Sequence, residues 1–182
     1  MGKYAIFLDM DGTFLGTDGQ LIEENINTVN EYMKKGHKFF ICSGRPRASI
    51  HDYIIDALPW NGIISSAGSE ILIDGVEIKR DEISKETAFF LADLFLKENV
   101  WLVLGNGKDG ICMNIEPRVN WKRVNSMEEL KEVYEYTTKI DHGPISDETK
   151  EKIVRELSHE LSFFYYDTYV ENIKTAIPRQ PQ

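Results

Sequence analysis

The sequence has few cysteines, few histidines and no long hydrophobic segment. Cys42 and Cys112 are the two cysteines among 182 residues, and each lies in an apolar run, so we expect buried thiols in a reducing compartment, not disulfides. The 4 histidines have no metal-ligand spacing, which argues against a zinc site. No apolar stretch approaches the roughly 18 residues that a membrane-spanning helix needs, and the first nine residues become acidic too early for a secretory signal. We therefore expect a cytoplasmic protein with no membrane partner.

The sequence also has fewer basic than acidic residues. Lys and Arg number 21 and Asp and Glu 30, which gives a formal net charge of −9. A field of this sign opposes nucleic-acid phosphates, so we expect no nucleic-acid partner. If the substrate is an anion, the site has to supply its own positive charge. The hydrophobic fraction of 42% is that of a globular protein and excludes wholesale disorder.

Strand-like and helix-like patterns alternate in the first part of the chain. Residues 4–8, 38–42 and 62–65 are apolar runs, typical of strands buried on both faces of a parallel sheet. Between the first two runs, apolar residues from Ile22 to Met33 recur at helical spacing, and a second helix is expected to turn Ile50, Ile54 and Leu58 inward. The order predicts the α/β class, with a Rossmann-like, doubly wound parallel sheet.

The pattern changes after the third run. Residues 71–78 resemble a hairpin around Asp74-Gly75, and from about residue 81 the spacing predicts a second, α+β unit. We expect a core at 1–80, a second domain at 81–175 and a tail at 176–182. The second domain should contain helices at 84–98, 127–133 and 146–157 and strands at 100–104, 110–115, 137–141 and within 161–174.

The strongest chemical signal is Asp9-Met10-Asp11-Gly12-Thr13, directly after the first strand. Ligands in open α/β sheets bind at the carboxyl ends of strands. In an extended stretch Asp9 and Asp11 point the same way, and two close carboxylates repel each other unless a cation lies between them. Mg²⁺ suits such a pair because it prefers oxygen ligands, keeps several waters and bridges to phosphate.

Phosphoryl transfer is the chemistry that needs this pair of acids. A carboxylate nucleophile divides one difficult displacement into two easier steps, and a second acid protonates the leaving oxygen and then deprotonates water. The plainer alternative is a pair of turn aspartates that cap a helix.

These residues resemble the first sequence motif of the haloacid dehalogenase superfamily, and the chain is similar to its Cof-type subfamily. Ser43-Gly44-Arg45-Pro46 resembles the second motif, and residues 63–71 resemble the stretch that leads to the subfamily's inserted α+β cap. Where the subfamily often has Asn-Gly, this chain has Ala67-Gly68. The resemblance covers roughly residues 3–175 and implies an incomplete core followed by a cap.

The resemblance also implies a reaction and a site. It implies Mg²⁺-dependent hydrolysis of a small phosphorylated metabolite, such as a sugar phosphate, through an aspartyl-phosphate. Asp9 would be the nucleophile and a metal ligand, and Asp11 would be the general acid and base and bind the metal through its carbonyl. Ser43 would donate to the phosphoryl oxygens. The remaining phosphate-binding residues in the two motifs would be Gly12, Thr13, Gly44 and Arg45.

Plainer interpretations of the positively charged and serine residues stay open. Ser43 to Pro46 also fits a helix N-cap followed by proline. Four basic residues could face an anionic substrate, but each one taken singly is more simply interpreted as a solvated surface charge. They are Arg45, Arg47, Lys79 and Arg80.

The later motifs of the superfamily, a lysine and then Gly-Asp with further acids, have no match in the sequence. Lys174 is interpreted as a solvated strand lysine, and Asp167 has no partner acid nearby. Weaker Mg²⁺ binding and weaker electrostatic stabilisation would follow, and the first strand would become a bare, apolar edge. We expect a truncated product. The alternative function is a catalytically impaired fragment that binds a partner chain or self-associates through the open sheet edge.

Two further patterns are given structural interpretations. Residues 105–110 fit Gly-x-Gly-x-x-Gly, but the alternating stretch that follows predicts a hairpin turn and not a dinucleotide site. Trp60, Trp101 and Trp121 are interpreted as packing residues.

Overall fold

The computed structural model describes residues 2–107, 109–118 and 121–174. The chain divides into two compact units, Met1–Arg80 (unit 1) and Asp81–Gln182 (unit 2). The expected tail at 176–182 lies outside the described residues. No helix in the described part of the chain is both long enough and apolar enough to cross a bilayer.

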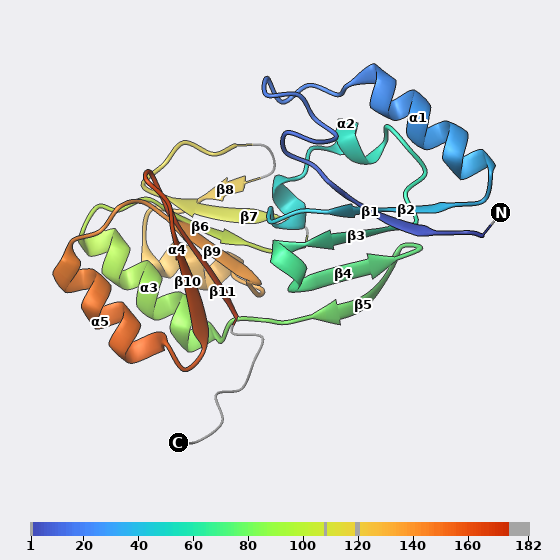
Figure 1. Cartoon of the computed structure of the whole chain (residues 1–182). Coiled ribbons are helices and arrows are strands. Elements are labelled where there is room, and N and C mark those ends of the chain that lie inside the picture. Colours follow the sequence, from blue (N-terminus) through green and yellow to red (C-terminus); the bar gives the residue numbers. More distant parts are fainter. Residues whose placement is uncertain (1, 108, 119–120, 175–182) are drawn as a thin grey trace. The chain divides into compact units, whose positions relative to one another are not determined.

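Unit 1 is a five-stranded sheet in the order β1-β2-β3-β4-β5 (Figure 1). The first three strands are parallel to one another, and the last two continue the sheet antiparallel, so the expected α/β class is confirmed. The elements are β1 (Ala5–Asp9), α1 (Glu23–Lys34), β2 (Lys38–Cys42), η1 (Arg47–Ser49), α2 (Asp52–Ile55), β3 (Gly62–Ser65), η2 (Ser66–Gly68), β4 (Glu70–Ile73) and β5 (Val76–Arg80).

Helix α1 forms because its apolar residues recur on one face. Val29 is buried, and Ile26 and Met33 pack beside it against the core of unit 1. The helix begins with Glu23 and Glu24 and has Lys34 in its last turn, charges that complement the helix dipole. The expected helix between the first two strands is therefore confirmed.

The second expected helix is wrong in extent. The chain forms the three-residue η1 and the four-residue α2, with Ile50 and His51 extended between them. Ile50, Ile54 and Leu58 are nevertheless buried, as their spacing predicted. The apolar spacing therefore predicted which residues are buried, but two short helical turns bury them as well as one continuous helix would.

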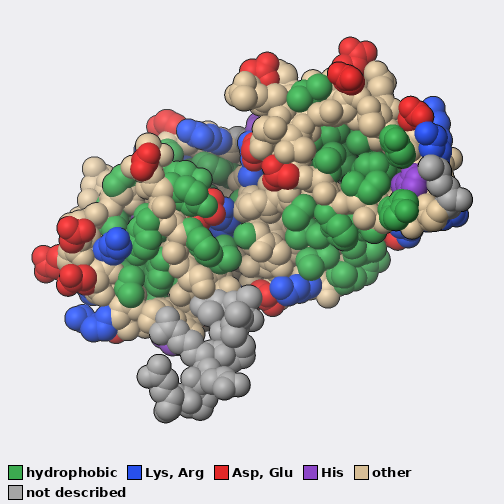
Figure 2. Space-filling view, viewed as in Figure 1, with side chains coloured by type: hydrophobic (Ala, Val, Ile, Leu, Met, Phe, Trp, Pro, Cys, Tyr) green, Lys and Arg blue, Asp and Glu red, His purple; other side chains and the backbone are tan. Residues whose placement is uncertain are grey.

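Strand β1 lies at the edge of the sheet, and the expectation that both its faces are buried is wrong. Its residues alternate between exposed and half-buried, and Phe7 is 57% exposed although its ring stacks on Phe40 at 5.1 Å. Ile6 and Leu8 point to the opposite face and pack against the core that includes Val29. Hydrophobic side chains gather over the strands of this unit in Figure 2. The edge position itself is the one that the sequence predicted.

Unit 2 contains a six-stranded sheet in the order β10-β11-β9-β6-β7-β8, in which only β7 and β8 run parallel. β6 and β7 form an antiparallel pair, so the expected hairpin at 105–110 is confirmed. The elements are α3 (Lys85–Lys97), β6 (Leu102–Gly105), β7 (Gly110–Met113), β8 (Trp121–Arg123), α4 (Met127–Val133), β9 (Lys139–His142), α5 (Asp147–Leu157), β10 (Leu161–Tyr165) and β11 (Val170–Lys174).

The three helices of unit 2 pack against one face of this sheet. Leu91 and Phe95 of α3, Leu130 of α4 and Ile153 of α5 share one buried cluster with strand residues such as Leu102. Each helix starts at a serine whose Oγ accepts a hydrogen bond from the backbone N–H three residues later, which satisfies a donor at the helix start. The opposite face of the sheet carries the alternate residues of each strand.

Neighbouring residues on β9 make stability respond to pH in opposite directions. Burial lowers the pKa of His142 from 6.5 to about 4. As the pH falls from 6.5 to 4, the unfolded chain therefore takes up this proton before the folded chain does, and the free energy of unfolding decreases. Burial raises the pKa of Asp141 from 3.8 to about 6, so the folded chain takes up that proton first and stability rises as pH falls from 6 to 4.

We expect Asp141→Asn to remove the stabilisation that protonation of Asp141 gives at low pH and to leave the destabilisation that protonation of His142 causes. Between pH 6.5 and 4.5 the variant should lose about 1–2 kcal/mol more stability than the wild type. Urea unfolding at both pH values measures this difference. Equal losses in the two proteins would contradict the assignment.

Candidate active site

The carboxyl ends of the three parallel strands lie side by side in unit 1. The register pairs Asp9 with Cys42 and Cys42 with Ile64, and Ser43 follows Cys42 directly. Strand ends in this position form the usual ligand-binding edge of an open α/β sheet. The sheet therefore brings the first predicted motif and the second to one edge.

The loop after β1 combines buried anchors with exposed polar residues. Met10, Phe14 and Leu15 are fully buried, and the amides of Phe14 and Leu15 donate to the carbonyl of Met10 at 3.1 and 2.9 Å. Between these anchors Asp11 is exposed, and so are Asp9 before them and Gly12 and Thr13 within the loop. The predicted site residues of the first motif are thus presented to solvent by a rigidly packed turn.

Backbone conformation explains why glycine is present at position 12. Gly12 has a φ of +78°, a left-handed conformation that side chains disfavour. A Cβ added there would meet no atom within 4 Å, so the space beside it is open. The loop can therefore take a ligand close to its backbone at this point.

Two hydrogen bonds hold the loop from the side. Asn25 at the start of α1 donates through Nδ2 to the carbonyl of Thr13 at 2.8 Å, and Thr13 Oγ1 donates to Asp9 Oδ2 at 3.4 Å. The part played by Asn25 was missed in the sequence, because it lies within an amphipathic helix pattern and carries no motif of its own.

Arg45 makes a two-point ion pair with Asp11. Its Nη2 lies 2.6 Å from Asp11 Oδ1 and its Nε lies 3.0 Å from Oδ2, the fork geometry in which guanidinium best binds carboxylate. Arg45 Nη1 also donates to the carbonyl of Ser49 at 3.4 Å. Arg45 is therefore a partly exposed charge that is ion-paired with Asp11, and the second motif places a positive charge beside the first.

Ser43 is buried, and the loop that it begins is tied to the end of β3. Its Oγ accepts a hydrogen bond from the backbone N–H of Arg45 at 3.1 Å. The amides of Ser66 and Ala67 donate to the carbonyls of Arg45 and Ser43 at 2.8 and 3.3 Å. Ser43 is thus positioned by hydrogen bonds from two loops, and no helix starts at it directly.

The turn after β3 holds three consecutive residues in the left-handed region. The φ values of Ser66, Ala67 and Gly68 are 50°, 51° and 92°, and this conformation costs a non-glycine residue about 1–2 kcal/mol. Asparagine tolerates the conformation better than alanine does. The Ala67-Gly68 pair, in which the chain departs from the Asn-Gly of the resemblance, therefore occupies a position whose backbone favours asparagine.

The other basic residues considered from the sequence lie apart from Asp9 and Asp11. Arg47 donates to the carbonyl of Ile50 and approaches Asp52 at 3.8 Å, and Arg80 pairs with Glu77. Lys79 donates to the carbonyl of Gly68 at 2.9 Å, beside the left-handed turn. In unit 2, Lys174 is exposed at the end of β11, as its sequence interpretation predicted.

The chemistry of the oxygen donors determines whether the site fits Mg²⁺. Within residues 2–107, 109–118 and 121–174, no three His, Cys, Asp or Glu side chains are grouped so as to hold a metal. Asp9 nevertheless supplies an exposed carboxylate. Both carboxylate oxygens of Asp11 are held by Arg45, so Asp11 would contribute its main-chain carbonyl, as the resemblance implies. Mg²⁺ is commonly held by one or two carboxylates, with waters and substrate phosphate completing its ligands. The donor set fits that mode, and the Asp9 carboxylate and the Asp11 main-chain carbonyl are the groups that would hold the ion.

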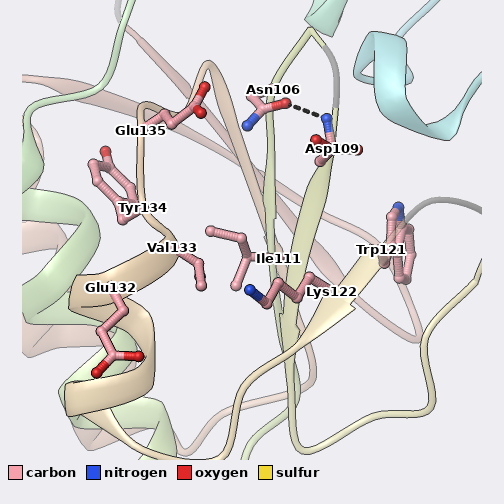
Figure 3. A pocket seen from close by; sticks show the side chains of 9 residues that line it. All are labelled: Asn106, Asp109, Ile111, Trp121, Lys122, Glu132, Val133, Tyr134 and Glu135. Atoms are coloured by element: carbon pink, nitrogen blue, oxygen red, sulfur yellow. Dashed lines mark hydrogen bonds between the residues drawn. The ribbon is translucent and has the colours of Figure 1, made fainter.

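Unit 2 has a groove of its own, of about 620 Å³ (Figure 3). Lys122 lies across its middle, with Asp109 and Glu135 toward the Asn106 end and Glu132 on α4. Asn106 Oδ1 accepts a hydrogen bond from the backbone N–H of Asp109 at 2.7 Å. None of the residues predicted for phosphoryl transfer lines this groove.

Comparison with known proteins gives one family and many similar folds. The sequence matches the haloacid dehalogenase-like hydrolase family over residues 6–182, whereas no curated protein matches it. A haloacid dehalogenase-like hydrolase from Bacteroides thetaiotaomicron has a TM-score of 0.83 at 17% identity, over 97% of this chain and 73% of its own.

Two further solved structures are similar to a comparable degree. A haloacid dehalogenase-like hydrolase from B. subtilis has a TM-score of 0.75 at 18% identity, over 93% of this chain and 73% of its own. A sugar phosphatase of subclass IIB of the superfamily has a TM-score of 0.74 at 17% identity, over 96% of this chain and 71% of its own. At these identities the likeness shows a common fold.

Proposed function

Because the chain belongs to the haloacid dehalogenase-like hydrolases, we propose that it is a Mg²⁺-dependent phosphohydrolase that works through an aspartyl-phosphate on Asp9. The observation that carries this proposal is the loop after β1, which presents Asp9 and Asp11 to solvent at the carboxyl end of a parallel strand. In this proposal unit 2 is the α+β cap of the resemblance.

The first step forms a bond from a carboxylate oxygen of Asp9 to phosphorus and breaks the bond from phosphorus to the leaving oxygen. Asp11 gives that oxygen its proton. Bound Mg²⁺ would neutralise charge between the carboxylates and the phosphoryl oxygens. Ser43 and the backbone amides near Gly12 and Gly44 are the proposed donors to the phosphoryl group. In the second step Asp11 takes a proton from water, which attacks phosphorus and releases Asp9.

Arg45 is proposed to position Asp11 and to supply positive charge near the phosphoryl group. The net charge of −9 repels a phosphate dianion, and the guanidinium of Arg45 lies directly against the first motif. Arg45 thus offsets the charge of Asp11 and reduces the negative charge that an anionic substrate would meet at this loop.

We expect Arg45→Ala to lower kcat by about 10- to 100-fold, because Asp11 loses its two-point partner and its orientation. Steady-state kinetics at several pH values measure the effect, and Arg45→Lys should restore only part of it because an ammonium cannot make the fork contact. Arg47→Ala is the matched control, since Arg47 contacts Ile50 and Asp52. Equal kcat values for the two alanine variants would contradict the role of Arg45.

The proposed substrate is a small phosphorylated metabolite, with sugar phosphates as the first class to test. The similarity in fold to a subclass IIB sugar phosphatase supports this choice. The experiment is phosphate release by the purified chain from p-nitrophenyl phosphate and from a panel of hexose and pentose phosphates in Mg²⁺. Folded protein that releases no phosphate from any of them would overturn the proposal.

One observation favours a second function, which is binding of another chain. β1 forms the edge of the described sheet, with Tyr4 64% and Phe7 57% exposed, and exposed edges of this kind pair with other strands. Sedimentation equilibrium tests self-association. A monomer with rapid phosphate release would reject this alternative, and an inactive dimer would favour it.

A further inference from the structure

The buried polar side chains of unit 1 gather at the carboxyl ends of β2 and β3 and at the start of β4. Among the described residues of this unit, the buried polar or charged side chains are those of Ser43, Ser65, Ser66, Ser69 and Glu70. Glu70 is the one carboxylate in this group, and its exposure is 0%. Because burial of a carboxylate costs free energy unless other groups compensate it, its position beside the proposed phosphate-binding loop needs a physical reason.

Glu70 and Ser65 stand at the two ends of the left-handed turn after β3. They are opposite each other in the antiparallel register of β3 and β4, and Ser65 Oγ donates a hydrogen bond to Glu70 Oε2 at 3.4 Å. Within the turn, Ser66 and Ala67 have φ values of 50° and 51°, and such a backbone persists only where its surroundings hold it. The contact between Glu70 and Ser65 joins side chains at the base of this turn, where the backbone pairing also ends.

The same turn supports the loop after β2. The amide of Ser66 donates to the carbonyl of Arg45 at 2.8 Å, and the amide of Ala67 donates to the carbonyl of Ser43 at 3.3 Å. Backbone dihedral angles set the direction of these amides, so both hydrogen bonds depend on the left-handed conformation. Arg45 in turn binds both carboxylate oxygens of Asp11. A series of contacts therefore leads from the buried carboxylate, through the turn, to the residues proposed for phosphoryl transfer.

We propose that Glu70 is a positioning residue for the phosphoryl transfer and acts through the turn after β3 on Arg45 and Ser43. Glu70 is buried, so it does not reach the substrate itself. This inference rests on the proposed function and deepens it, because it adds a residue of β4 to a site otherwise built from the loops after β1 and β2.

We expect Glu70→Ala to lower kcat by about tenfold and to change KM less, because Arg45 loses the support that orients it toward the proposed acid. Glu70→Gln should restore most of kcat, since its amide oxygen can still accept a hydrogen bond from Ser65 Oγ. Steady-state kinetics on the full chain, with the substrate that the wild type hydrolyses best, measure both constants.

Asn61→Ala is the matched control for a loss of stability alone. Asn61 Oδ1 accepts a hydrogen bond from the backbone N–H of Phe39 at 3.1 Å, at the opposite ends of β2 and β3 from the site. Its variant should unfold in less urea than the wild type and keep normal kcat. If Asn61→Ala lowers kcat as much as Glu70→Ala does, the effect is one of stability and the proposal is wrong.

A double variant tests whether Glu70 acts through Arg45. Two changes along one series of contacts should cost less together than the product of their separate costs, because the second finds the contact already broken. Glu70→Ala combined with Arg45→Ala should therefore lose less activity than the product of the two single losses. Losses that multiply would show independent action and would overturn the proposal.

Hydrogen exchange gives a readout that does not depend on activity. The amides of Ser66 and Ala67 should exchange about tenfold faster or more in Glu70→Ala, and at the wild-type rate in Glu70→Gln and Asn61→Ala. Ser65→Ala removes the same hydrogen bond and covers the case in which Glu70→Ala does not fold. It should show the same two changes, in kcat and in exchange, to a smaller extent.

The two readouts separate this inference from the function on which it rests. A wild type that releases no phosphate, with exchange altered in the variants as expected, would overturn the proposed phosphoryl transfer while the turn still depended on Glu70. An active wild type whose kcat and amide exchange are unchanged in Glu70→Ala, or in Ser65→Ala where the former does not fold, would overturn the role of Glu70 and leave the proposed function standing.

Discussion

Asp9→Asn is expected to reduce phosphate release by at least about 10³-fold, because a neutral amide cannot attack phosphorus and no covalent intermediate can form. The loss should appear in kcat for every substrate that the wild type hydrolyses. The fold should survive, since Asp9 is exposed and its side chain makes one long hydrogen bond, to Thr13. Steady-state phosphate release and urea unfolding measure the two properties.

Asp56→Asn is the matched control for this variant. Asp56 is also an exposed aspartate of unit 1, and it lies at the end of α2, away from the strand ends. Its variant should keep normal turnover. If Asp9→Asn releases phosphate at a rate comparable with Asp56→Asn, then Asp9 is not the nucleophile and the aspartyl-phosphate mechanism is wrong.

Removal of Mg²⁺ is expected to have an effect of similar size. With excess EDTA, turnover should fall by at least about 10²-fold and should return when Mg²⁺ is added back, because two carboxylates and a phosphate dianion repel each other without a cation. Activity as a function of free Mg²⁺ gives the affinity. One carboxylate and one main-chain carbonyl, with no group of three His, Cys, Asp or Glu side chains that could hold a metal among the described residues, should hold the ion weakly.

Stability separates a catalytic ion from a structural one. The loop after β1 is held by buried Met10, Phe14 and Leu15 and by Asn25, so its fold does not depend on a metal. The thermal midpoint in EDTA should therefore match that in Mg²⁺ to within a degree or two. Full turnover in EDTA would exclude the proposed cofactor, and a large drop in the thermal midpoint would give the ion a structural role instead.

Much of the fold could be predicted because apolar spacing and turn residues agreed along the chain. The alternation in residues 4–65 predicted the parallel strands and α1, and Asp74-Gly75 predicted the hairpin, where Asp74 and Gly75 both have positive φ. The three serine-capped helices of unit 2 were expected within two residues of their ends. These are elements in which local preference and burial favour the same structure.

What could not be predicted depends on contacts between distant residues. β8 was missed because Trp121–Arg123 is a three-residue strand defined by its pairing with β7. The ion pair between Asp11 and Arg45 joins residues 34 positions apart, and no local sequence pattern indicates which acidic residue an arginine pairs with. For β1, composition predicted two buried faces, but burial depends on which elements lie against a strand. The roles of Asp9, Asp11 and Ser43 remain predictions.

The position of β1 has a consequence for how firmly Asp9 is held. Lys38 donates from its backbone N–H to the carbonyl of Tyr4, so in a parallel ladder Tyr4, Ile6 and Leu8 face β2 while the amides of Ala5 and Phe7 point outward. Those two amides should exchange with deuterium quickly, and their neighbours slowly. Asp9, the proposed nucleophile, thus stands at the end of a strand anchored along one side, and any group that bonds to the outward amides would also restrain Asp9.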